Sequence, residues 1–307
     1  MPLELRSYQS SDLETLRALV TDPSLAGELD TLQGVDGLER KLTDPYHVSP
    51  LLTLAFLDGA PVGFAGVFIL SGREGRTAIY RVGVLERFRR RGVGAALLEY
   101  VAKALISFDP GAGKEAMGAW QPSPEADRLA ARHGFAHARW FWLMERAIGP
   151  IAEPAWPDGV STERWDGSER RARDMSDAYN DSFSSHFGSP VSTPGSVRGL
   201  LSRPGMDPDG LRLAYRDGRC VGFCRCELFE ARGEIAVLGT THDARGIGLG
   251  RALLRWGVRW LEAAGAPRVT LVVDGENETA LRLYRGEGFE VARTRHIWTR
   301  PGPAGLG

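Results

Sequence analysis

The sequence carries one block of residues twice, and this duplication limits the possible folds more than any other feature. Residues 78–98 and residues 234–254 both read as a strand, a turn rich in Arg and Gly, and the start of an amphipathic helix. Gly92 and Gly248 are 156 positions apart, and Asp-Gly and Gly-Phe pairs on either side of the block recur at nearly the same spacing. Because the repeat is one domain long, the chain is predicted to hold two similar domains in tandem rather than a solenoid.

The chain length agrees with this interpretation, since 307 residues suffice for two domains of about 150 residues each. Each half reads as a strand, a helix, a hairpin with an Asp-Gly turn, a third strand, a long helix and a last strand–helix–strand unit. This order predicts an α/β class with α+β mixed sheets: two tandem domains, each a mixed, mainly antiparallel sheet flanked by helices. We expect an N-terminal domain at 1–149, a Pro-rich linker at 150–158, a second domain at 159–300 and a flexible tail at 301–307.

Composition excludes several classes of function. The formal net charge is −1, which gives no overall attraction to nucleic acid or to an anionic membrane. No apolar run approaches the ~20 residues that span a bilayer, and the first residues lack the segments of a signal peptide. The three cysteines, Cys220, Cys224 and Cys226, lack the spacing and the further ligands of a zinc site. We therefore expect a cytoplasmic protein with no metal and no nucleic-acid or membrane partner.

The repeated turn has the composition of a phosphate-binding loop. It reads Arg-x-x-Gly-x-Gly in both copies, at Arg89–Gly94 and Arg245–Gly250. Glycines let backbone N–H groups approach an anion, and the helix that follows adds partial positive charge at its N-terminus. Neither copy ends in the Gly-Lys-Ser/Thr of a Walker A loop or has the third glycine of a dinucleotide-binding loop. A solvated strand-to-helix turn is the alternative, and the presence of two copies makes it the weaker one.

A second block identifies the family that the chain resembles. Residues 277–289 read Asn-x-x-Ala-x-x-x-Tyr, followed by Gly288-Phe289. Together with the Arg-x-x-Gly-x-Gly loops, this pattern is similar to the GCN5-related N-acetyltransferase (GNAT) family. The resemblance covers nearly the whole chain and extends to the tandem two-domain type of the family, the mycothiol synthase type. It implies an acyl-CoA-dependent N-acetyltransferase with acetyl-CoA (coenzyme A) as the acyl donor.

The resemblance also assigns residues that would bind coenzyme A. In the second domain these are Leu238, Gly239 and Thr240 on the strand, Arg245, Gly246, Ile247, Gly248, Leu249, Gly250 and Arg251 in the loop, and Asn277 and Ala280. In the first domain they are Val82, Gly83, Val84, Arg89, Arg90, Arg91, Gly92, Val93, Gly94 and Ala95.

Two residues of the second domain are candidates for proton transfer. Tyr284 matches the family's general acid, which protonates the departing thiolate, and its alternative is a core aromatic. Glu234 is the candidate general base, five residues before Gly239 and so roughly 17 Å back along an extended strand; its alternative is a surface glutamate at a strand end. The aligned residues of the first domain are Ala78 for Glu234, Ser123 for Asn277 and Ala130 for Tyr284. We therefore expect chemistry only in the second domain, while the first keeps the loop and so the capacity to bind coenzyme A.

The sequence thus predicts transfer of an acetyl group from acetyl-CoA to a primary amine of a small molecule, by direct attack. One alternative is a protein N-terminal or lysine acetyltransferase, and another, of a different class, is a non-catalytic acyl-CoA-binding sensor or scaffold. A monomer and a homodimer are both compatible with the sequence. The polar segment Asp181–His186 is a candidate for contact with the acceptor.

Overall fold

The computed structural model describes residues 2–25, 51–72, 75–108, 111–120, 124–202 and 206–303. The chain forms two compact units, one of residues 1–140 with 294–307 and one of residues 141–293. Each unit has a mixed sheet flanked by helices, which confirms the expected fold class.

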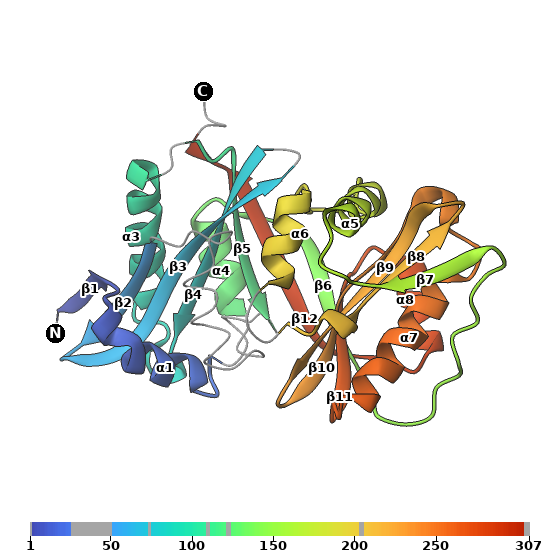
Figure 1. The fold of residues 1–307 in the computed structure, drawn as a ribbon. Coiled ribbons are helices and arrows are strands. Elements are labelled where there is room, and N and C mark those ends of the chain that lie inside the picture. The colour runs from blue at the N-terminus through green and yellow to red at the C-terminus, as the bar shows by residue number, and fades with distance from the viewer. Residues whose placement is uncertain are drawn as a thin grey trace. The chain divides into compact units, whose positions relative to one another are not determined.

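The first unit contains the sheet β1-β2-β3-β4-β5-β12, in which only β4 and β5 run parallel. Its elements, blue to green along the chain in Figure 1 with β12 in red, are β1 (Leu3–Ser7), α1 (Leu13–Thr21), β2 (Leu51–Leu57), β3 (Ala60–Gly72), β4 (Gly75–Val84), α3 (Val93–Phe108), β5 (Lys114–Trp120), α4 (Pro124–Arg132) and β12 (Glu290–Pro301). Buried side chains of α3 cover one face of the sheet and those of α1 cover the other.

The second unit repeats this arrangement with the order β6-β11-β10-β9-β8-β7, and only β10 and β11 run parallel. Its elements are β6 (Ala136–Ala147), β7 (Val160–Arg164), α5 (Glu169–Ser182), α6 (Pro194–Leu201), β8 (Leu211–Arg216), β9 (Arg219–Phe229), β10 (Arg232–Thr240), α7 (Leu249–Ala263), β11 (Arg268–Asp274) and α8 (Glu278–Gly286) (Figure 1). The face that packs on α7 is held by Leu253, Leu254, Val258 and Leu261, which are buried at helical spacing. Buried residues of α5 and α6 cover the opposite face.

The last strand of each half completes the sheet of the other half, so the units differ from the expected boundaries. Residues 141–147 of β6 pair with β11, and residues 295–301 of β12 pair with β5. The boundaries expected at residues 149 and 300 therefore fall at 140 and 293. Alternation of apolar residues marks a strand but carries no information about which of two similar sheets the strand joins.

The expected linker, 150–158, lies within a stretch of irregular backbone. Residues 148–159 form neither helix nor strand between β6 and β7. At the other end, Pro301 still pairs with Lys114, so the expected tail begins inside β12. Residues 304–307 lie outside the described residues.

Candidate active site

The candidate site is built on the β9–β10 hairpin, where β10 contains a bulge. Ile235 pairs with Cys226 and Val237 pairs with Arg225, so Ala236 is an extra residue in β10. A regular strand turns successive side chains to opposite faces, and the bulge interrupts that alternation. As a result, residues 234, 237 and 239 of β10 all share one face.

That shared face is the α5 side of the sheet. A Cβ on Gly239 would lie 2.6 Å from Cζ of Phe223, whose ring packs in the cluster with α5, and Val237 contacts the same cluster. Ile235 faces the other way, since its side chain lies beside Gly257 of α7. Glu234, adjacent to Ile235, is therefore placed on the α5 side.

Strands β10 and β11 are paired over only part of their length. Their parallel register joins Gly233–Ile235 to Val269–Leu271, and no pair joins the described residues of the two strands beyond that point. The bulge at Ala236 comes directly after the last pair. The backbone groups of 236–240 that point away from β9 thus have no strand partner on the β11 side.

Glu234 lies at the beginning of this separation and is held by a neighbouring arginine. Nη2 of Arg232 donates a hydrogen bond of 2.6 Å to Oε2 of Glu234. The Arg232 side chain is 3% exposed and lies over the ring of Phe229 at 4.7 Å, whereas the Glu234 side chain is 21% exposed. Glu234 is thus a half-buried carboxylate with a fixed partner.

Tyr284 lies on the other side of the same sheet. It belongs to the buried cluster on the α7 face, and its ring is 6.1 Å from that of Phe289. Burial raises the pKa of the Tyr284 phenol well above its usual value. The hydroxyl is protonated at neutral pH with or without this shift. Glu234, at the point where β10 and β11 part, and Tyr284 therefore lie on opposite faces of the sheet.

The Arg-x-x-Gly-x-Gly loops have the same backbone conformation in both units. Gly246 and Gly248 have φ of 80° and 91°, and the aligned Arg90 and Gly92 have φ of 62° and 81°. Gly248 is the N-cap of α7, so the first N–H groups of that helix lack intrahelical partners. Residues 245–248 are exposed, and no heavy atom lies within 4 Å of a Cβ built on Gly246 or Gly248. An open, exposed helix N-terminus of this kind fits a pyrophosphate.

The first arginine of each loop is used to fix the loop itself. Arg245 donates to the carbonyl oxygen of Ser182 at 3.1 Å. In the first unit, Arg89 donates to the carbonyl oxygens of Ser24 and Val84 at 2.7 and 3.0 Å. These contacts join the second loop to Ser182, the last residue of α5, and the first loop to Ser24, just after α1.

Several other residues expected to bind coenzyme A have a defined structural role. Oδ1 of Asn277 accepts a hydrogen bond of 3.0 Å from the backbone N–H of Ala280 and so caps α8. Leu249 and Val93 are buried at the start of α7 and α3, which leaves only their backbone for a ligand. The Asn-Glu-Thr-Ala sequence was itself a signal for the cap.

The first unit differs from the second in more than its side chains. The register of β3 with β4 runs without interruption from Gly63–Val84 to Gly72–Gly75, so β4 has no bulge. Ala78 is fully buried in the cluster that packs on α3, the face opposite to that of Glu234. The alignment of Ala78 with Glu234 holds in sequence but is wrong for the direction of the side chain. Ala130, aligned with Tyr284, is buried in the same cluster, and Ser123 lies outside the described residues.

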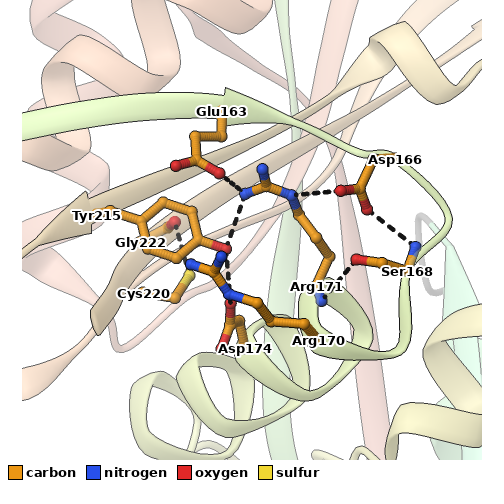
Figure 2. A network of polar contacts seen from close by, with 9 residues as sticks. All are labelled: Glu163, Asp166, Ser168, Arg170, Arg171, Asp174, Tyr215, Cys220 and Gly222. Carbon is orange, nitrogen blue, oxygen red and sulfur yellow. Dashed lines mark hydrogen bonds and ion pairs between the residues drawn. The ribbon is translucent and has the colours of Figure 1, made fainter. Parts of the chain in front are cut away.

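Helix α5 is anchored to the sheet at both ends. At its N-terminal end, Arg171 forms ion pairs with Glu163 and Asp166 and donates to Tyr215, whose hydroxyl in turn donates to Asp174 at 2.8 Å (Figure 2).

At the C-terminal end of α5, Asp181 accepts a hydrogen bond of 2.7 Å from the backbone of His242. Asp181, expected as an acceptor contact, therefore joins α5 to the segment before the loop.

The described residues contain no group of three or more His, Cys, Asp or Glu that could hold a metal ion. Cys224 and Cys226 are instead buried against Gly257 of α7. No helix in the described part of the chain has the length and apolar character needed to cross a membrane.

Sequence reasoning missed the bulge at Ala236 and the residues around Glu234. The signal available was the pair of Arg-x-Glu triplets at Arg225–Glu227 and Arg232–Glu234. Residues two apart on a strand share a face, so each triplet predicts an ion pair.

Comparison with known proteins gives the same result for both halves of the chain. The acetyltransferase (GNAT) family matches residues 14–135 and 172–289. A mycothiol acetyltransferase of Thermomonospora curvata is 32% identical over 253 residues, covering 81% of this chain and 82% of that protein. One of Kineococcus radiotolerans is 34% identical over 243 residues, covering 77% of each.

Solved structures share the fold. A GCN5-related N-acetyltransferase from Sphaerobacter thermophilus has a TM-score of 0.76 at 23% identity, covering 97% of this chain and 95% of that one. A tandem GNAT protein from the clavulanic acid biosynthesis pathway has a TM-score of 0.71 at 16% identity and covers 98% of both chains. The resemblance seen in the sequence is thereby confirmed: the chain belongs to the GNAT acetyltransferase family, as an acyl-CoA-dependent N-acetyltransferase with two family domains in tandem.

Proposed function

We propose that the second unit transfers an acetyl group from acetyl-CoA to a primary amine of a small molecule. The observation that carries this proposal is that Glu234 lies where β10 separates from β11, with Tyr284 in the cluster on the opposite face of the sheet. A donor that enters the separation meets the base on one face and the acid on the other.

The loop and the unpaired strand supply the binding groups. The pyrophosphate of the donor would be held by the N–H groups of the loop at Gly246 and Gly248 and by the first turn of α7. Arg251, exposed on that turn, would add a charge-assisted hydrogen bond. The backbone of Leu238–Thr240 would bind the extended arm. Acetyl-CoA, when bound, supplies the activated thioester.

The two side chains divide the proton transfers between them. An amine acceptor arrives as an ammonium with a pKa of about 8 to 10.4, and Glu234 accepts its proton, directly or through water. Tyr284, which is protonated at neutral pH, donates a proton to the leaving thiolate through a positioned hydrogen bond. Backbone N–H groups of 238–240 would polarise the carbonyl.

We propose that the first unit does no chemistry. It retains the loop conformation at Arg90 and Gly92, but Ala78 and Ala130, aligned with the base and the acid, are buried apolar residues. Its loop keeps the capacity to bind coenzyme A.

The relatives favour a small-molecule acceptor over a protein. Those of Thermomonospora curvata and Kineococcus radiotolerans are named mycothiol acetyltransferases and align with more than three quarters of this chain. The amine acceptor of that reaction is therefore the first to test.

The test is the release of free thiol from acetyl-CoA by the full chain, with and without amine acceptors. Glu234→Gln and Tyr284→Phe are each expected to lower kcat about 100-fold or more, the usual contribution of general acid–base catalysis. Glu230→Gln, which changes an exposed carboxylate in the turn of the same hairpin, is the matched control and should leave kcat unchanged.

Two results would contradict the proposal. If Glu234→Gln and Tyr284→Phe both release thiol at the wild-type rate when amine is added, neither residue has the role assigned to it. Tight binding of acetyl-CoA with no release for any amine would support the sensor instead.

A further inference from the structure

The α5 side of the β9–β10 hairpin carries four charged side chains beyond the part that α5 covers. Glu234 pairs directly with Glu227, Arg232 pairs with Phe229, and Arg225 pairs with Val237. Residues opposite each other in an antiparallel pair share a face, with Cβ atoms about 5 Å apart. The two carboxylates therefore lie side by side, with one arginine at each end of the patch.

Each carboxylate is fixed by the arginine two residues before it. Arg232 bonds to Glu234, and Arg225 bonds to Glu227. The side chains of the arginines are 3% and 11% exposed, while those of Glu234 and Glu227 are 21% and 20% exposed. The guanidinium groups are thus enclosed and the carboxylates reach solvent.

Each carboxylate has one arginine partner and still reaches solvent, and two ionised carboxylates directly opposite each other on a sheet repel, so this pair favours a further cation. In addition, Nε of Arg225 is buried without a hydrogen-bond partner among the described residues. A polar ligand on this face would offset the repulsion and also give the buried donor a partner. A cation would attract both carboxylates, and an oxygen atom would accept a hydrogen bond from Nε of Arg225.

The first unit serves as an internal comparison. The pair aligned with Glu227 and Glu234 is Ile69 and Ala78, and the pair on the α1 face at the same level is Phe68 and Ile79. Both pairs are apolar. The charged patch therefore occurs in the unit that also carries the bulge and Tyr284.

We propose that Glu227 is a specificity-determining residue that, together with Glu234, holds the ammonium group of the acceptor before its proton is removed. This inference rests on the proposed function, and it restricts the acceptor to amines that arrive protonated. Glu234 then accepts the proton while Glu227, still bound by Arg225, keeps the nitrogen in place.

The experiment measures steady-state kinetics with acetyl-CoA and a fixed panel of amines: glycinamide, glucosamine, 2-aminoethanol and propylamine. For the best amine of the wild-type protein, Glu227→Gln is expected to raise KM for the amine about tenfold or more, the effect of losing one charge-assisted contact. KM for acetyl-CoA should stay within twofold and kcat within threefold. Glu234→Gln, in contrast, should lower kcat.

Glu230→Gln is the matched control and should leave every parameter unchanged. An unchanged amine KM in Glu227→Gln would overturn the inference, as would an equal rise in both KM values, because the latter marks a structural role. If the wild-type protein releases no thiol with any amine of the panel or with the acceptor of the mycothiol acetyltransferases, the proposed function fails and this inference with it. If the wild-type protein releases thiol and Glu227→Gln has the same KM for the amine, the inference about Glu227 fails while the proposed function stands.

Discussion

At the scale of single residues, the duplicated loops show which positions are set by backbone conformation. Arg90 occupies the left-handed region at a φ of 62°, where the second unit has Gly246. An L-residue in this region costs about 1–2 kcal/mol, and glycine avoids that cost. The first unit therefore stores strain at a position that the second unit has relieved.

We predict that Arg90→Gly leaves the first unit as stable as the wild type or up to about 1 kcal/mol more stable, because the relieved strain outweighs the added freedom of the unfolded chain. Arg91→Gly, one residue later and outside the left-handed region, should destabilise it by some tenths of a kcal/mol. Urea denaturation of both variants checks the difference. An equal loss of unfolding free energy in the two variants would mean that Arg90 is not strained.

Two histidines of the first unit make its stability depend on pH. Burial lowers the pKa of both His133 and His296, and the imidazole of His137, 4.9 Å from His296 between ring centroids, lowers that of His296 further. Below about pH 6.5 the unfolded chain binds protons that the folded unit does not, so stability falls as pH falls toward the folded pKa values. Above pH 6.5 the two histidines are neutral in the folded and the unfolded state, so they add nothing to the pH dependence of stability.

We therefore predict a lower free energy of unfolding at pH 5 than at pH 7.5, with part of the loss removed in the variant His133→Gln/His296→Phe. Urea denaturation at the two pH values gives the comparison, and His242→Gln, at an exposed histidine of the second unit, is the control. An identical pH-dependent loss in the wild type and the double variant would show that other groups cause it.

At the scale of the strand, one inserted residue distinguishes the unit proposed to be catalytic from its copy. The bulge at Ala236 turns Glu234 to the α5 face, whereas the regular β4 turns the aligned Ala78 into the core under α3. A sequence alignment compares residue types and does not register this change of face.

Ala78→Glu, which restores the aligned residue, is accordingly predicted to place a carboxylate in an apolar cluster and to lower the free energy of unfolding by several kcal/mol. It should add no acetyl transfer. Ile79→Glu puts the same charge on the half-buried opposite face and should cost less. Urea denaturation of both variants measures the loss of stability, and thiol release from acetyl-CoA measures any new acetyl transfer. A stable Ala78→Glu protein with new activity in a Glu234→Gln background would refute the role of the bulge.

The sequence was sufficient for most elements and insufficient for their finer geometry. The hairpin with an Asp-Gly turn that the sequence predicts in each half is formed by β2 with β3 and by β8 with β9. The loop was recognisable because it needs glycine at Gly246 and Gly248. The bulge leaves no such requirement, since Ala236 adopts it without a special residue. Asn277, which the resemblance assigns to coenzyme A, also caps α8.

At the scale of the whole molecule, each unit is completed by a strand whose sequence belongs to the other half. Arg146 on β6 and Arg300 on β12 are 154 positions apart and make equivalent contacts. Arg146 donates to the carbonyl oxygen of Glu287 at 3.0 Å, and Arg300 to that of His133 at 2.6 Å. Each carbonyl precedes a Gly-Phe pair, so the duplicated sequence also duplicated the docking contact of its last strand.

The two arginines also bind carboxylates within the unit that each strand completes, one of them buried and the other half-buried. Nε of Arg300 donates to Glu115 at 2.6 Å, and Nη1 of Arg146 donates to Glu262 at 2.9 Å. The Glu115 side chain is only 6% exposed. Removing one member of a buried ion pair costs about 3–5 kcal/mol, because the other charge is left without compensation.

We predict that Arg300→Met destabilises the first unit by about 3 kcal/mol, although residue 300 follows the second half in sequence. Amide hydrogen exchange should increase in β5 and leave β10 and α7 protected, whereas Arg146→Met should increase exchange in β11 and leave β4 and α3 protected. The double variant Arg300→Met/Glu115→Gln should recover part of the loss, since no buried charge then lacks a partner. If Arg300→Met instead raised exchange in β11 and spared β5, the last strand would stabilise its own half, and the exchange of strands between the units would be wrong.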